Sequence, residues 1–172
     1  MPTLHLVRHT PAPPSAVWEV LTDFGAHGRW MPLTTMRLDQ GSPRLGWSFA
    51  GLTGWGPARF RDTMVVTGWR PPVDRSDPAG DGDLADDGDP ARGELRLVKT
   101  GRLLGGWIQV TVGQHGTGST LVWHEEVTIR PLPAKRLTGP VVGPVATWLY
   151  TRAIDGMLGQ AMRATTPPAG AR

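Results

Sequence analysis

The chain has 172 residues, of which 39% are hydrophobic and 19% charged, a composition typical of a globular protein. A chain of this length fits one domain and buries about two thirds of the surface that it exposes when unfolded. It contains no cysteine, which excludes disulfide bonds, thiol nucleophiles and metal sites with cysteine ligands.

The net charge of +3 is unevenly distributed. Seven of the 15 acidic residues and the single base Arg75 lie between residues 74 and 89, so the rest of the chain has 17 bases and 8 acids, a charge of +9. Such a charge attracts anionic ligands, membranes or nucleic acid. The arginines are scattered rather than clustered with aromatic residues, which favours an ordinary solvated surface without a nucleic-acid partner.

The sequence does not predict export or a membrane span. Its first residues lack the uninterrupted apolar core of a signal peptide. The most apolar segment, 137–158, contains two Gly-Pro pairs and the charged residues Arg152 and Asp155. We therefore expect a soluble helix there and a cytoplasmic location.

The N-terminal part predicts one strand and two short helices. Residues 3–9 alternate weakly between apolar and polar, which indicates a strand. Pro13 and Pro14 suit the start of a helix, and Asp23 suits the N-cap of a second short helix that ends near Trp30.

The middle of the chain alternates in the manner of strands, with Gly, Pro and Asp between them. We place six strands near 34–40, 45–52, 57–70, 93–101, 105–113 and 119–130. Residues 71–92 are rich in Asp, Gly, Pro and Ala, and this composition predicts a mobile loop. The alternative, a calcium loop, is disfavoured because the ligand spacing and closing glutamate of an EF-hand are missing.

The C-terminal segment from about 140 to 164 predicts a long amphipathic helix. Its apolar side is formed by Leu149, Ala153, Ile154, Met157, Leu158, Ala161 and Met162. An antiparallel sheet can curl around such a helix, giving an α+β fold with a cavity between the two layers.

Three stretches carry a family resemblance. They read T-P-A-P-P-S-A-V-W-E-V-L-T-D-F-G-A-H-G-R-W-M-P, V-V-T-G-W-R-P-P and G-S-T-L-V-W-H-E-E-V, in this order. Together with the predicted element order, they resemble the SRPBCC, or helix-grip, superfamily of START-like, Bet v 1-like and polyketide cyclase/dehydrase proteins, and more narrowly its polyketide cyclase-type branch. The resemblance implies a single domain in which a seven-stranded curved antiparallel sheet holds a long C-terminal helix. It does not by itself fix a function.

Three ionisable residues interrupt the apolar faces of predicted strands. Glu125 has the parity of Leu121, Trp123 and Val127, a face that in the resembling family points to the cavity. By the same reasoning, Asp62 shares a face with Phe60, Met64 and Val66, and Lys99 with Leu95 and Leu97. A buried carboxylate has to be protonated, be paired or face a water-filled pocket. The amine of Lys99 could neutralise one of the two carboxylates, and the three residues converge if the assumed strand register holds.

These three are the candidate catalytic residues. One carboxylate would act as a base, Lys99 would hold an enolate oxygen, and the other carboxylate would return the proton, as polyketide cyclisation and dehydration require. Each also has a structural explanation. Glu125 could lie near the strand end or pair with an arginine, Asp62 could mark the pocket rim or a bulge, and Lys99 could be a solvated cation at a strand end.

The expected function is binding of a small hydrophobic or aromatic, polyketide- or lipid-like molecule, with or without catalysis. The expected ligand contacts are Trp30, Phe49, Phe60, Met64, Leu97, Trp123 and Met157. Taken singly, Trp30, Phe49, Phe60 and Trp123 are more typical of a core than of a ligand contact, although in a fold with a cavity a residue can be both. The five histidines lack metal-ligand spacing, and no nucleotide or hydrolase motif is present, so we expect neither metal nor cofactor. A non-catalytic carrier and a partner-binding module are the alternatives, and the chain is expected to be a monomer or homodimer.

Overall fold

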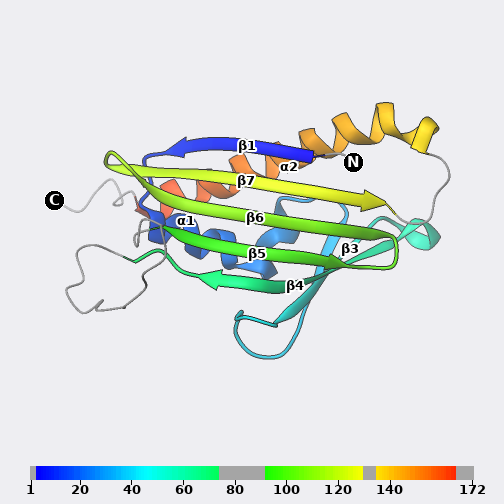
Figure 1. Ribbon diagram of the computed structural model, residues 1–172, viewed down its shortest axis with the longest axis horizontal. Coiled ribbons are helices and arrows are strands. Elements are labelled where there is room, and N and C mark those ends of the chain that lie inside the picture. The colour runs from blue at the N-terminus through cyan, green and yellow to red at the C-terminus, as the bar shows by residue number, and fades with distance from the viewer. Residues whose placement is uncertain (1–2, 74–91, 130–134, 166–172) are drawn as a thin grey trace.

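The computed structural model describes residues 3–73, 92–129 and 135–165. Its central element is a seven-stranded antiparallel sheet with the strand order β1-β7-β6-β5-β4-β3-β2 (Figure 1). The strands are β1 (Thr3–Thr10), β2 (Thr34–Leu38), β3 (Ser48–Thr53), β4 (Phe60–Arg70), β5 (Gly93–Thr100), β6 (Leu104–His115) and β7 (Gly118–Ile129).

Four helical segments connect or follow the strands, namely α1 (Pro14–Thr22), η1 (Phe24–Arg29), η2 (Gly56–Ala58) and α2 (Lys135–Thr165). Proline at the first position of α1 supplies a helical φ angle where no backbone donor is needed. The Asp23 side chain accepts a hydrogen bond of 3.2 Å from the backbone N–H of Ala26 and so caps η1, as predicted.

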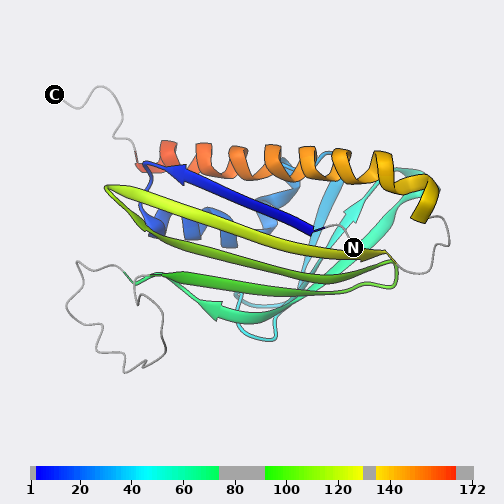
Figure 2. The ribbon, with the colours of Figure 1, turned by 45° about the horizontal axis from the view of Figure 1, so that its top comes forward.

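The molecule has two layers. Figure 1 looks onto the outer face of the sheet, with α1 and α2 behind it, and Figure 2 shows α2 running along the inner side of the curved strands. The core lies between these layers. Its larger buried side chains come from the sheet and from all three helices that cover it: Val17, Trp18, Leu21, Phe24, Trp47, Phe49, Val66, Leu95, Leu97, Ile108, Val110, Val112, Leu121, Trp123, Ile154, Met157 and Leu158.

The predicted helix-grip architecture is confirmed, with differences at the element boundaries. The strand predicted at 57–70 begins at Phe60, because Pro57 lies within the short helix η2. The C-terminal helix begins at Lys135, before the Gly-Pro pairs that we took as its start. Met162 was expected on the apolar side but is 41% exposed. Most of the loop predicted at 71–92 lies outside the described residues.

None of the helices that the structure describes combines the length and the apolar character needed to cross a lipid bilayer.

Candidate functional site

The inner face of the sheet carries a polar cluster in an otherwise apolar surface. We define this polar cluster as Asp62 on β4, Lys99 on β5, Glu125 on β7 and Tyr150 on α2. Strand register explains why the three strand residues meet. Met64 and Gly106 flank Lys99 on the neighbouring strands, and Asp62 lies two residues before Met64, on the same face.

Lys99 is the centre of this cluster. Its Nζ donates a hydrogen bond of 2.7 Å to Asp62 Oδ2 and lies 3.4 Å from Glu125 Oε1. The side chains of Lys99 and Glu125 are each 1% exposed, and that of Asp62 is 11% exposed. A buried ammonium group is stable only when it is paired, and here two carboxylates supply that pairing.

Gly106 provides the room for the contact between Lys99 and Glu125. The two residues are on strands β5 and β7, about 10 Å apart across the intervening strand β6. On β6, the position opposite Lys99 is Gly106, which has no side chain to block the path. Gly106 has φ +120°, and a Cβ there would collide with the carbonyl oxygen of Glu126. Glycine is therefore required by the backbone at this position.

Glu125 accepts further hydrogen bonds. Trp123 Nε1 donates to Glu125 Oε2 at 3.2 Å, and the hydroxyl of Tyr150 donates to the same carboxylate. Burial raises the pKa of Glu125 above its usual value, although Lys99, Trp123 and Tyr150 oppose the shift. A carboxyl group with a raised pKa can exchange a proton closer to neutral pH than an ordinary glutamate can.

Lys99 and Tyr150 hold their protons. Burial alone would lower the pKa of Lys99, but the neighbouring carboxylates of Glu125 and Asp62 outweigh burial and raise it. Burial, together with the neighbouring Glu125, raises the pKa of Tyr150. At neutral pH, Lys99 is therefore a fixed cation rather than a neutral amine nucleophile, and Tyr150 is a neutral hydrogen-bond donor.

Two carboxylate oxygens of the cluster are not satisfied within the described part of the chain. Asp62 Oδ1 and Glu125 Oε1 are buried and have no hydrogen-bond partner there, although Glu125 Oε1 keeps its ion-pair contact with Lys99. Buried acceptors without a donor are costly, and in native proteins such atoms are paired with ordered water, an ion or another group, or have a catalytic role.

The inner face changes character along the strands. Towards α1 it is sealed, since Leu95, Val110 and Leu121 are 0% to 3% exposed. Beyond the polar cluster, Phe60 and Val127 are only partly buried. Among the described residues, the inner face is thus less completely covered at the end at which β4 begins and β7 ends.

The expected ligand contacts divide between these two regions. Phe49, Leu97, Trp123 and Met157 are buried core residues, whereas Trp30, Phe60 and Met64 are partly buried. The ring of Trp30 packs against Gly156 of α2, where a Cβ would overlap with it.

The structure also bears on particular alternatives for the three candidate residues. The side chain of Lys99 is enclosed, so it is not a solvated cation. Glu125 is paired with a lysine and not with an arginine. The irregularity in β4 lies between Val66 and Gly68 and does not involve Asp62.

Sequence reasoning missed Tyr150. It lies three and four residues before Ala153 and Ile154, so helical spacing places it on the same buried side of α2. That spacing was the signal that could have identified it.

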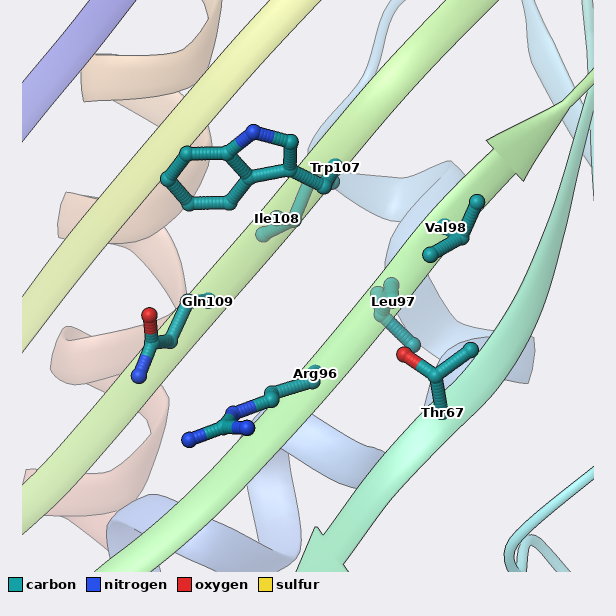
Figure 3. Close-up of a pocket in the computed structure, with 7 residues that line it drawn as sticks. All are labelled: Thr67, Arg96, Leu97, Val98, Trp107, Ile108 and Gln109. Atoms are coloured by element: carbon teal, nitrogen blue, oxygen red, sulfur yellow. The ribbon is translucent and has the colours of Figure 1, made fainter.

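A separate hollow lies on the outer face of the sheet (Figure 3). It has a volume of about 390 Å³ and is lined by Thr67, Arg96, Leu97, Val98, Trp107, Ile108 and Gln109. In Figure 3, Arg96, Trp107 and Gln109 stand on the side of the sheet away from the helices. This hollow is therefore not the space between sheet and helix in which we expected a ligand.

The described residues contain no group of three or more His, Asp or Glu side chains arranged to hold a metal ion. Two pairs of histidine rings do lie in contact across strands in a tilted arrangement, His5 with His124 and His9 with His115.

Comparison with known structures shows which folds this chain is similar to. No family model matches the sequence, and no curated protein does. A START superfamily protein from Mycobacterium smegmatis has a TM-score of 0.62 at 12% identity, over 95% of this chain and 99% of that chain. The Zhui aromatase/cyclase from Streptomyces sp. R1128 has a TM-score of 0.64 at 15% identity, over 98% of both chains.

The structure of Ara h 8.0201 is similar as well, with a TM-score of 0.59 at 11% identity, over 91% of this chain and 97% of that chain. Likeness at such low identity concerns the fold and not the activity. The chain therefore has the helix-grip fold of the START-like and Bet v 1-like proteins.

Proposed function

We propose that this chain binds a small hydrophobic or aromatic molecule, polyketide- or lipid-like, between the inner face of the sheet and α2, next to the polar cluster. The observation that carries the proposal is the pair of buried, unsatisfied acceptors, Asp62 Oδ1 and Glu125 Oε1, on an otherwise apolar face. Ligand sites combine this kind of apolar lining with a few placed polar groups.

Partial exposure at the end where β4 begins and β7 ends supports the same location. Partly buried apolar side chains surround the cluster at that end, and burying them further against a ligand contributes about 25 cal/mol per Å² of apolar surface. Phe60 and Met64 on β4 and Trp30 after η1 are the contacts that remain available. Leu97 and Trp123 would form the floor.

Native mass spectrometry of the purified full chain tests the proposal. A small molecule carried through purification should appear as an added mass that disappears on denaturation. The Met64→Trp variant, which fills the partly buried space next to Lys99, should lose this adduct. Val98→Trp, a matched change on the outer face of the neighbouring strand, should keep it. Retention of the adduct by the first variant and loss by the second would contradict the assignment to the inner face.

Acid–base catalysis is the second candidate function, and the raised pKa of Glu125 beside a fixed cation favours it. Glu125 would remove a proton from the carbon next to a carbonyl group, and the ammonium of Lys99 would stabilise the enolate oxygen. Loss of a β-hydroxyl group with the proton returned by Glu125 then gives water and a double bond. Asp62 would keep Lys99 in place. The Zhui neighbour is an aromatase/cyclase, which makes a polyketide dehydration or cyclisation the reaction to test.

Glu125→Gln separates the two functions. It keeps the shape of the side chain and removes the proton acceptor, so an enzyme should lose turnover by at least roughly a hundredfold while a carrier keeps its affinity within a few-fold. Glu126→Gln is the matched control, because Glu126 is the next residue on β7 and points to the outer face. Full turnover in Glu125→Gln would eliminate the acid–base assignment.

A further inference from the structure

We propose that the ligand is an uncharged molecule with a hydroxyl group, an alcohol or a phenol, and that the site rejects carboxylates and phosphate esters. This inference rests on the proposed binding at the inner face and adds the chemical class of the ligand. It follows from which charges at the site are already paired and which polar atoms are left over.

The cations that face α2 from the sheet are already engaged. Lys99 has two carboxylate neighbours, at 2.7 Å and 3.4 Å. Arg8, further along the inner face on β1, donates to Asp155 of α2 at 2.8 Å. At Lys99, an anionic ligand would have to displace a protein carboxylate and leave it buried without a partner. The Arg8 pair lies nearer the surface, with Asp155 52% exposed.

The atoms left over at the cluster are acceptors, whereas the one left over on the ligand contact Trp30, outside the cluster, is the donor Nε1. Asp62 Oδ1 and Glu125 Oε1 each have lone pairs but no donor in the described part of the chain. Two carboxylates stand against the single ammonium of Lys99, so an incoming carboxylate or phosphate meets more negative than positive charge in a poorly screened site. A hydroxyl group brings the donor that is missing and no charge.

Tyr150 shows that this chemistry suits the site. Its phenol hydroxyl donates to Glu125 and remains protonated because burial raises its pKa. A second hydroxyl, from the ligand, would complete the hydrogen bonding of Asp62 or Glu125 in the same way. A hydrogen bond from a neutral donor to a charged acceptor discriminates against an analogue without the donor by roughly 10- to 100-fold.

Three probes of one skeleton test the class: 2-naphthol, 2-methoxynaphthalene and 2-naphthoate, titrated into the full chain at pH 7.5 by calorimetry. We expect 2-naphthol to bind at least roughly tenfold more tightly than the ether, which lacks the donor, and than the carboxylate. In Glu125→Gln, the advantage of 2-naphthol over 2-naphthoate should shrink by about tenfold, because one of the two negative charges is gone. In Glu126→Gln it should be unchanged.

The outcomes separate the inference from the proposed function. Binding of 2-naphthoate as tight as that of 2-naphthol overturns the hydroxyl class and leaves inner-face binding intact. The hydroxyl class is also overturned if 2-naphthol has the same advantage over 2-naphthoate in Glu125→Gln as in Glu126→Gln. The hydroxyl group would then be recognised elsewhere, such as in the hollow of the outer face. No binding of any probe, with no molecule retained in native mass spectrometry, overturns both.

Discussion

The Lys99→Met substitution removes the buried ammonium group and keeps an unbranched side chain of similar length. In the variant, Asp62 and Glu125 lose the cation that lies 2.7 Å and 3.4 Å from them. Two buried carboxylates without a cation cannot both remain ionised, so one of them takes up a proton when the chain folds.

The cost of that proton uptake sets the magnitude. A carboxyl group with the usual glutamate pKa of 4.5 is ionised in the unfolded chain at pH 7.5. Protonating it three pH units above this value costs about 4 kcal/mol, and one unit above it about 1.4 kcal/mol. The variant should therefore lose about 4 kcal/mol of unfolding free energy at pH 7.5, within the range known for breaking a buried ion pair, and about 1.4 kcal/mol at pH 5.5.

Urea unfolding followed by tryptophan fluorescence between pH 5.5 and 7.5 measures this loss. Arg8→Met is the control, because its pair with Asp155 is 31% and 52% exposed and should contribute under about 1 kcal/mol. A loss in Lys99→Met that is independent of pH, or no greater than that in Arg8→Met, would refute the electrostatic account of the cluster.

Two further predictions concern single positions. Gly106→Ala should lose at least about 3 kcal/mol of unfolding free energy, because it adds a collision with the Glu126 carbonyl to a left-handed φ. Gly46→Ala is the control, because Gly46 has φ +80° but no atom within 4 Å of an added Cβ. It should lose only about 1 kcal/mol of unfolding free energy. Equal losses for the two variants in urea unfolding would rule out the collision at Gly106. Burial lowers the pKa of His27, whose Nε2 donates to the Leu21 carbonyl at 2.9 Å. Below pH 6.5, the unfolded chain therefore binds more protons than the folded chain does. The unfolding free energy of the wild type should therefore fall relative to His27→Gln as the pH drops below 6.5, and parallel pH profiles would contradict this.

The sequence predicted the order of the elements because each depends on local patterns. Alternation located the seven strands, two prolines located the start of α1, and Asp23 located the cap of η1. Element boundaries were less accurate where a local signal competed with packing. The Gly-Pro pairs at 139–140 and 143–144 suggested that the last helix begins late, yet α2 begins at Lys135. The length of a helix in a folded protein depends on the surface that the helix covers as well as on the helix propensity of its residues.

The site was predictable only in part, because strand parity gives the face of a residue but not its position along the sheet. Asp62, Lys99 and Glu125 were each assigned to the inner face from two-residue periodicity, and each lies there. Their contact depends on register, which parity leaves open. Shifting β5 by two residues would keep Lys99 on the inner face and move it by about 7 Å along the strand, away from both carboxylates.

What fixes the register is apolar packing at the sealed end. Leu95 and Leu97 of β5 lie opposite Val110 and Ile108 of β6, and all four are at most 4% exposed. A two-residue slip would break these pairs and would also place a side chain where Gly106 now leaves space for Lys99 to reach Glu125. The charged contacts are therefore positioned by hydrophobic residues two to four positions away. Substitutions at Leu95 or Ile108 should alter the polar cluster even though neither residue belongs to it.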